Sequence, residues 1–279
     1  NVAFALPGHS LTAGERDDMI KPVLALLDLE RVRDRVPASL SAAEAAAVAV
    51  ARAMVREAPV LLLDDPWCML SPRDREVRAR AMYRWAEEKH CAVLYATQDV
   101  TGALGVTDQI AVMHEGRLEQ EGEPREVVRT PTTEFVATYV AGAVVCEATL
   151  RSLPRGGWRI ELPFGETQSD TLDGAEHMTR HAMVRVALRP DAITLAGARE
   201  TADASGLIRD YDFAGDHWRA QVEVAEGLVV PVRVPLSFEP GIGAELRLRV
   251  HADGIAVVGR VTNEPELPPN VLRMPSESW

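Results

Sequence analysis

The sequence has few of the features that mark secreted, membrane-spanning or metal-bound proteins. Its apolar runs, such as Pro59 to Leu63, are far too short to cross a bilayer. The N-terminus lacks the basic segment followed by an apolar one that characterises signal peptides. The three cysteines, Cys68, Cys91 and Cys146, are odd in number and widely spaced, which favours reduced thiols over a disulfide framework or a zinc site. A cytoplasmic protein is therefore expected.

Basic residues are also scarce relative to acidic ones. The formal net charge of the 279 residues is -12. Residues 1–141 carry 16 basic and 22 acidic groups, and residues 142–279 carry 14 and 20. Neither half therefore offers the basic stripe that binding to a phosphate backbone requires, and no nucleic-acid partner is expected. His177 and His181 are spaced to share one helix face, but no third ligand lies near them in the sequence, which argues against a metal site there.

The first half of the chain alternates helical and strand patterns. Apolar residues recur at helical spacing between Thr12 and Leu29 and again between Ser41 and Glu57. Thr12 has a glutamate three positions later, as in a capping box, and Ser41 is a good N-cap for the second helix.

A strand, a helix and a second strand follow. Val60 to Leu63 and Ala92 to Thr97 have the continuous apolar character of strands buried on both faces, and residues 73–89 between them predict a helix. Such a crossover implies a parallel sheet with ligands at the carboxyl ends of its strands.

After Val140 the apolar period changes from helical to alternating. Residues 184–188, 222–224, 230–234 and 246–250 alternate apolar and polar side chains, with Gly and Pro between the runs. The second half is therefore predicted to be all-β, and the Pro-rich and polar residues 263–279 to be an irregular tail.

Two acidic residues, Asp64 and Asp65, directly follow the first of the two apolar strands. One carboxylate at such a position can hold the water shell of Mg²⁺, and a second can orient a water for attack on a phosphoryl group. The alternative is structural, because acidic residues cap many strand ends.

The order and spacing of four motifs resemble the ATP-binding subunits of ABC transporters. Leu40-Ser41-Ala42-Ala43-Glu44, followed by a helix, resembles the LSGGQ signature, and Val60–Pro66 resembles the Walker B strand. Leu70-Ser71 lies where the family has its D-loop, and Ala96–Asp99 lies where it has the switch motif Thr-His-Asp. The ordered set is specific, although each motif alone would be weak.

The β-rich half resembles the transport-associated OB-like (TOBE) domain of importer ATPases for polyamines, iron and sugars. Residues 184–191 look like its Arg-Pro-Glu strand and turn, and residues 206–259 look like its second half. The resemblance implies an α/β fold, a partial P-loop NTPase-like parallel sheet with helices, followed by an all-β OB-like (TOBE) domain. The domains expected are residues 1–141, lacking the P-loop part, residues 142–262, and the tail.

The sequence departs from this family at most of the functional positions. No GxxxxGK[ST] loop occurs, and because the chain begins with Asn1 in an apolar run, truncation of a longer protein is favoured over a gene product lacking the loop. Ala42 and Ala43 place β-carbons where the family's glycines let amides approach the partner's γ-phosphate. Glu44 replaces a glutamine and adds a negative charge beside that phosphate.

The catalytic positions implied by the resemblance are also altered. Asp65 stands where the family has its catalytic glutamate and is one methylene shorter, so a water it held would be misplaced by about 1 Å, which can lower the rate on the order of 100-fold. Gln98 replaces the switch histidine and cannot be charged near neutral pH. Ser71 replaces the aspartate of the D-loop. Asp64 alone matches, as the residue of the Mg²⁺ shell.

These motifs and their departures from the family are compatible with three functions. The leading hypothesis is an importer subunit with a degenerate nucleotide site and a structural or regulatory role, peripheral on the cytoplasmic face of the inner membrane. It would dock on the permease subunits and pair through the ATPase-like half with itself or with an active ATPase subunit. The second is a working ATPase whose P-loop lies upstream of residue 1. The third is a binding module whose β half senses a small anion or sugar. The resemblance implies ATP and Mg²⁺ as cofactors, although the chain without its P-loop is expected to bind ATP weakly or not at all.

Overall fold

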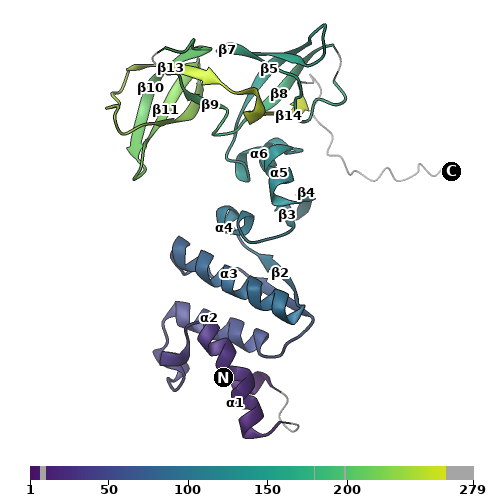
Figure 1. Cartoon of the computed structure of the whole chain (residues 1–279), viewed down its shortest axis with the longest axis vertical. Coiled ribbons are helices and arrows are strands. Elements are labelled where there is room, and N and C mark those ends of the chain that lie inside the picture. The colour runs from purple at the N-terminus through teal and green to yellow at the C-terminus, as the bar shows by residue number, and fades with distance from the viewer. Residues whose placement is uncertain (7–10, 179, 198, 262–279) are drawn as a thin grey trace, which may run out of the picture. The chain divides into compact units, whose positions relative to one another are not determined.

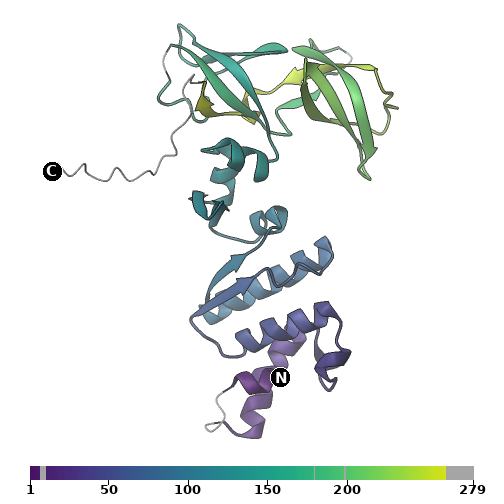
Figure 2. The same cartoon turned by 180° about the vertical axis from the view of Figure 1, so that it is seen from behind.

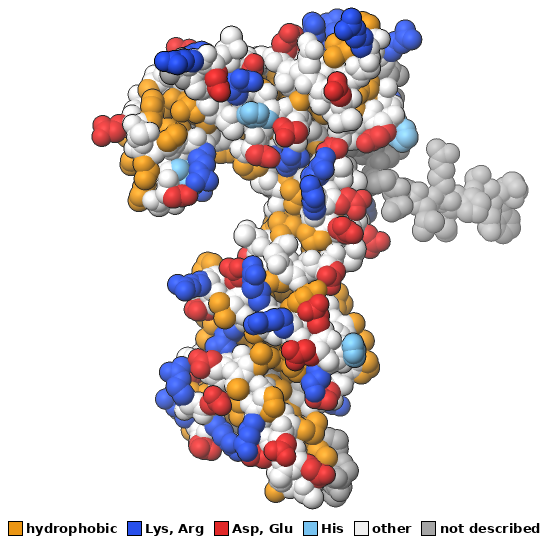
Figure 3. All heavy atoms as spheres, in the orientation of Figure 1, with side chains coloured by type: hydrophobic (Ala, Val, Ile, Leu, Met, Phe, Trp, Pro, Cys, Tyr) orange, Lys and Arg blue, Asp and Glu red, His pale blue; other side chains and the backbone are white. Residues whose placement is uncertain are grey.

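The computed structural model describes residues 1–6, 11–178, 180–197 and 199–261. The chain divides into two compact units, Asn1–Ile110 and Ala111–Trp279 (Figure 1). None of the helices in the described residues is both long and apolar enough to cross a membrane. On the face in view in Figure 3, acidic and basic side chains are interspersed.

Capping boxes start the first two α-helices of the first unit. Helix α1 (Ala13–Leu26) follows Thr12 and helix α2 (Ala42–Met54) follows Ser41, as the sequence predicts. Helix α1 ends three residues before the predicted Leu29, since Asp28 takes a left-handed conformation with φ 53°. Short 3-10 turns complete this region at Val2–Ala5, Glu30–Val32 and Pro37–Ser39.

The predicted strand, helix and strand form one unit of parallel sheet. Strand β1 (Val60–Asp64) pairs in parallel with β2 (Ala92–Ala96), and α3 (Pro72–Lys89) connects them. Helix α4 (Val100–Leu104) follows β2. Figure 1 shows α3 alongside the strand pair, and Figure 2 shows the same pair from behind.

The prediction that β1 and β2 are buried on both faces is wrong for the structure described. Leu61 and Leu63 lie in the core of the first unit, whereas Val60 is 53% exposed and Leu62 is 69% exposed. Leu94 on β2 is 67% exposed. Successive side chains of a strand point to opposite faces, and in this unit only one face packs against the helices.

The second unit begins with a hairpin and two short helices. Strands β3 (Ile110–His114) and β4 (Arg117–Gly122) form the hairpin, which is followed by α5 (Pro124–Arg129) and α6 (Glu134–Tyr139). Ala137 of α6 is buried against Ala187 and Val258 of the β-rich region. Helix α6 therefore packs within the second unit. The domain boundary predicted from the apolar period lies later, after residue 141, and whether the chain folds separately from that residue stays a prediction.

Two five-stranded antiparallel sheets make up the rest of the second unit. One has the order β14-β8-β5-β6-β7 and the other the order β12-β11-β10-β13-β9. The first sheet comprises Val144–Ser152 (β5), Trp158–Leu162 (β6), Gly165–Ser169 (β7), His181–Leu188 (β8) and Ile255–Arg260 (β14). The second comprises Ile193–Leu195 (β9), Ala204–Phe213 (β10), Trp218–Ala225 (β11), Leu228–Val234 (β12) and Glu245–Val250 (β13). A 3-10 turn at Ala252–Gly254 precedes β14.

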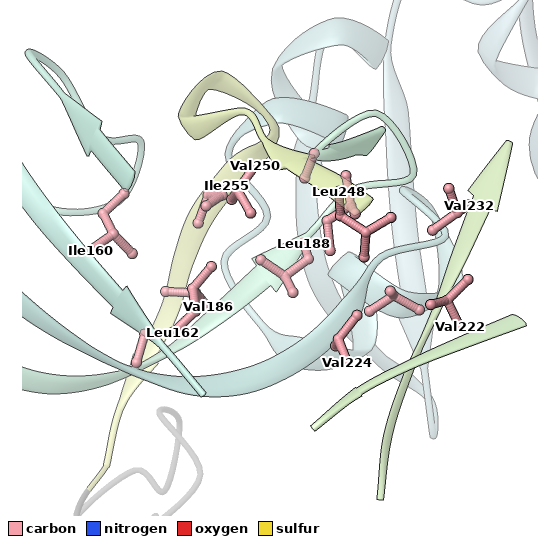
Figure 4. Close-up of a cluster of buried hydrophobic side chains, with 14 of the residues drawn as sticks. Ile160, Leu162, Val186, Leu188, Val222, Val224, Val232, Leu248, Val250 and Ile255 are labelled. Atoms are coloured by element: carbon pink, nitrogen blue, oxygen red, sulfur yellow. The ribbon is translucent and has the colours of Figure 1, made fainter. Parts of the chain in front are cut away.

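One apolar core joins the two sheets. It includes Ile160 and Val186 from the first sheet and Val222, Val232 and Leu248 from the second (Figure 4). These are inward positions of alternating strands, as the sequence predicts. His181 is the first residue of β8, so the proposed helix face shared with His177 does not exist.

We expect residues 142–262 to fold alone and residues 111–262 to fold with a higher melting temperature. The shorter fragment retains both sheets, but it loses the buried Ala137 and with it part of the cover over Ala187 and Val258. Thermal unfolding followed by circular dichroism, with proton NMR to show dispersed amide signals, compares the two. Disorder of residues 142–262 beside an ordered longer fragment would contradict the predicted boundary.

Candidate ATP-hydrolysis site

Asp64 and Asp65 lie at the carboxyl end of the parallel strand pair. Asp64 is the last residue of β1, pairs in register with Ala96 and is exposed. Asp65 follows it and is half-buried. This is the edge of a parallel sheet at which ligands bind, so the structure places both carboxylates where the sequence predicted them.

The position of Asp65 is fixed by contacts with the end of β2. Its backbone nitrogen donates to the carbonyl of Ala96 at 2.8 Å, which continues the ladder one residue beyond β1. Its backbone is left-handed, with φ 37°, a conformation that aspartate tolerates better than most residues. The Thr97 hydroxyl donates to its Oδ1 at 3.0 Å. The carboxylate therefore points to the segment that resembles the switch motif.

The switch-like segment, residues 97–99, is held by the cap of α4. Asp99 is the N-cap, with its Oδ1 accepting from the Gly102 amide at 3.1 Å. Its own backbone nitrogen donates to the Thr97 hydroxyl at 3.0 Å. Thr97 thus bridges Asp65 and Asp99, while Gln98 is exposed.

The segment after β1, residues 66–71, contains the predicted D-loop pair Leu70-Ser71. This D-loop-like segment is anchored in the core by Trp67. This side chain is 0% exposed, and the guanidinium carbon of Arg78 lies 5.9 Å from its ring centroid. At the end of the segment, Ser71 is the N-cap of α3 and accepts from the Asp74 amide at 3.2 Å. The Ser71 hydroxyl therefore caps the N-terminus of α3.

Arg75, in the first turn of α3, connects the D-loop-like and switch-like segments. Its Nε donates to the Leu70 carbonyl and its Nη2 to the Cys68 carbonyl, both at 3.0 Å. Its Nη1 lies 3.6 Å from Oδ2 of Asp99. The sequence prediction did not include Arg75. The sequence does place this cation in the first turn of a predicted helix, where the helix dipole disfavours positive charge, and that position could have indicated a specific acceptor for Arg75.

The signature-like segment forms a closed capping box at the start of α2. The backbone nitrogen of Ser41 donates to the Glu44 carboxylate at 2.7 Å, and the Glu44 nitrogen donates to the Ser41 hydroxyl at 3.2 Å. Arg35 lies 3.8 Å from the same carboxylate. Hydrogen bonds from the Ser41 amide and then the Ser41 hydroxyl hold the pKa of Glu44 below its usual value. Glu44 is therefore an anion at neutral pH.

The structure brings Asp65, Thr97, Asp99 and Arg75 together but leaves the signature-like segment separate. Within the described ranges, no hydrogen bond or ion pair joins Leu40–Glu44 to Asp64, Asp65 or Asp99. A direct contact within one chain was not expected, since the resemblance implies that this segment acts on the nucleotide of a partner.

The acidic edge fits Mg²⁺ only as a partial site. In the part of the chain that the structure describes, no group of three or more His, Cys, Asp or Glu side chains is arranged to hold a metal ion. Mg²⁺ in nucleotide sites is usually held by one or two carboxylates, with water and phosphate as its other ligands. Asp64 can supply that protein share, and the rest would have to come from water and nucleotide.

Comparison with known proteins matches the chain to two families. Residues 3–68 match the ABC transporter family, and residues 186–258 match the TOBE domain family. The chain is 33% identical over 235 residues to the Fe(3+) ions import ATP-binding protein FbpC 1 of Rhizobium meliloti, covering 83% of this chain and 64% of that protein. It is 30% identical over 266 residues to the corresponding FbpC of Agrobacterium fabrum, covering 92% and 71%. Identity to the spermidine/putrescine import ATP-binding protein PotA 1 of Pseudomonas aeruginosa is 30% over 242 residues, covering 84% and 64%.

The fold is that of an ATP-binding cassette followed by a TOBE domain. The chain belongs to the family of ABC importer ATP-binding subunits. It spans 64% of the length of the Rhizobium and Pseudomonas relatives.

Glu44→Gln should remove a pH-dependent part of the stability. Because the folded-state pKa of Glu44 is depressed, its stabilisation is fully present above the unfolded pKa and is lost as pH falls through the folded pKa. We expect the wild-type melting temperature to exceed that of Glu44→Gln near neutral pH, and the difference to shrink in acid. Glu88→Gln, an exposed change near the end of α3, is the control. A difference that is constant with pH would show that the charge of Glu44 contributes nothing.

Proposed function

We propose that this chain is the nucleotide-binding-type subunit of an ABC importer, with a degenerate ATP site and a structural or regulatory role. It docks on permease subunits at the cytoplasmic face of the inner membrane. It pairs through its ATPase-like unit, either with a second copy or with an active ATPase subunit. ATP and Mg²⁺ are the ligands of the family, and this chain holds them weakly at most.

The observation that carries the proposal is the engagement of Asp65. In place of a longer glutamate, a short carboxylate lies at the sheet edge and accepts a hydrogen bond from Thr97 at 3.0 Å. A general base that is already bonded to a neighbouring hydroxyl and lacks one methylene is poorly placed to activate a water. The neighbouring Gln98 cannot replace the charge that a histidine could carry.

The start of α2 supports the same proposal. A helix N-terminus attracts phosphate because its first amides are free and its dipole is positive. Here the Glu44 carboxylate already accepts from the Ser41 amide at 2.7 Å. An incoming phosphate would meet an anion at that position, and Ala42 and Ala43 add β-carbons beside it.

The second candidate is a working ATPase that tolerates these changes. Asp64 and Asp65 do lie at the carboxyl edge of a parallel strand pair, and relatives named for import of Fe(3+) and of spermidine or putrescine are ATP-binding proteins. An in-frame GxxxxGK[ST] upstream of residue 1 separates the candidates. The cargo is set by the permease and its binding protein, so neighbouring genes identify it better than this chain can.

The 279-residue chain should bind Mg-ATP weakly or not at all. Its sequence contains no GxxxxGK[ST], so neither the nest of backbone amides nor the lysine for the triphosphate is present. Isothermal titration calorimetry measures the affinity, with a relative that has the complete loop as positive control. Binding at micromolar affinity that requires Mg²⁺ would contradict the prediction.

Supplying a P-loop segment from a functional relative should restore ATP binding more readily than turnover. The P-loop and Asp64 hold nucleotide within one subunit, whereas the signature-like segment, Asp65 and Gln98 act on the partner's phosphate or on the attacking water. Asp65→Glu with Gln98→His should raise turnover only modestly in this graft. The second set, Ala42→Gly, Ala43→Gly and Glu44→Gln, should be needed as well, because dimer closure precedes hydrolysis.

Phosphate release is measured for the graft alone, for each set of changes, and for both sets together. Turnover by the unmodified graft at the rate of the donor relative would show that the altered motifs are harmless. The working-ATPase candidate would then replace the proposal.

A further inference from the structure

We propose that Arg75 is a positioning residue that couples the D-loop-like segment to the switch-like segment, so that a contact on the first changes the placement of Asp65. The inference rests on the proposed function for its biological meaning. Its physical content, a linkage between two loops, can be tested without nucleotide.

The three nitrogens of the Arg75 guanidinium face acceptors on two different loops. Two of them bond to main-chain carbonyls of the D-loop-like segment, Cys68 and Leu70, and the third faces the Asp99 carboxylate. The guanidinium is a rigid planar fork, so its three nitrogens move together. A displacement of the Cys68–Leu70 backbone therefore displaces the charge that faces Asp99.

The linkage continues from Asp99 to Asp65. The Asp99 nitrogen and the Asp65 carboxylate share one group, the Thr97 hydroxyl, which accepts from the first and donates to the second, each at 3.0 Å. A shift of Asp99 thus alters the hydrogen bond that orients Asp65. Hydrogen bonds in such chains strengthen one another, so a change in the bond at Asp99 also changes the bond at Asp65.

The surroundings of Arg75 favour a specific role over a casual surface contact. Its side chain is 29% exposed and that of Asp99 is 22% exposed, so solvent screens the pair less than it screens most surface pairs. The first turn of α3 is electrostatically unfavourable for a cation, and the three acceptors offset that cost. The D-loop-like segment is also anchored by the buried Trp67, and beyond that anchor Arg75 bonds to the main chain at Cys68 and Leu70.

Hydrogen exchange of the full chain, followed by NMR, tests the coupling. Arg75→Gln should speed exchange of the Gly102 amide, which bonds to Asp99, as well as that of the Leu70 amide, each by about tenfold. Asp99→Asn keeps an oxygen that can accept from Gly102, so the local cap persists. It should nevertheless speed exchange of Leu70, across the loop. The double variant should exchange at Leu70 like Arg75→Gln alone.

Two further variants sharpen the test. Arg73→Gln replaces an exposed arginine in the same turn of α3. It should leave the exchange rates of both the Leu70 and the Gly102 amides unchanged. Arg75→Lys keeps the charge but not the fork, and should still show fast exchange at Leu70. Unchanged Leu70 exchange in Asp99→Asn would overturn the inference, because Arg75 would then only brace its own loop. Full protection of both amides in Arg75→Lys would overturn the role of the fork.

Thiol labelling gives an independent readout of the same loop. Cys68 is exposed, whereas burial raises the pKa of Cys146 to about 12, so Cys146 serves as a slow internal control. Arg75→Gln and Asp99→Asn should both change the labelling rate of Cys68 and leave that of Cys146 unchanged. A change in Arg75→Gln alone would again limit Arg75 to its own loop.

A form with a supplied P-loop separates this inference from the proposed function. If that form turns over ATP, Arg75→Gln should lower kcat by about tenfold or more with little change in KM, since only the placement of Asp65 is affected. Turnover at the donor's rate with exchange coupling present would reject the degenerate site but keep the coupling. Turnover that is insensitive to Arg75→Gln, with no exchange coupling, would reject the coupling alone.

Discussion

Parallel pairing of β1 with β2 places the carboxylates of the candidate site beside its switch-like segment. The register sets Asp64 opposite Ala96, and the bond from the Asp65 nitrogen to the Ala96 carbonyl extends the ladder past the end of β1. Two loops must therefore leave the same edge side by side. The Thr97 hydroxyl then links the two loops, since it donates to the Asp65 carboxylate and accepts from the Asp99 nitrogen.

The loop after β1 is held at two places. Trp67 is fully buried, and the burial of its large apolar ring anchors the loop in the core. Beyond Trp67, Cys68 is exposed and Leu70 is half-buried. Arg75 donates a hydrogen bond to the main-chain carbonyl of each. The buried Trp67 therefore anchors the loop next to Asp65, and Arg75 holds the part further along.

The sequence predicted those structural features that depend on residues close together in the chain. The predicted capping box at Thr12, the N-cap at Ser41, the strand, helix and strand, and the alternating runs of the second unit rest on residues close in the chain or on the apolar period. The contact between Arg75 and Asp99 was not predicted because it depends on the β1 and β2 register, which joins segments far apart in sequence. The apolar period predicted β8, β11, β12 and β13 but not β5, β6, β7, β9, β10 or β14. Strand β7, for example, contains no aliphatic residue, and the first four residues of β14 are all apolar, so neither alternates.

Stability and nucleotide chemistry compete for the same groups at two places in the first unit. At the start of α2, a carboxylate on the Ser41 amide satisfies the helix end, and that end is then less available to a phosphate. At the end of β1, the bond from Thr97 holds Asp65 in one orientation, and a carboxylate so held is less free to turn toward a water. Each contact lowers the free energy of the folded chain in the absence of ligand. Catalytic groups act through interactions that strengthen in the transition state, so a group engaged elsewhere must first exchange its partner. Nucleotide chemistry at either place would therefore require the internal bond of Glu44 or Asp65 to be replaced by a bond to phosphate or water.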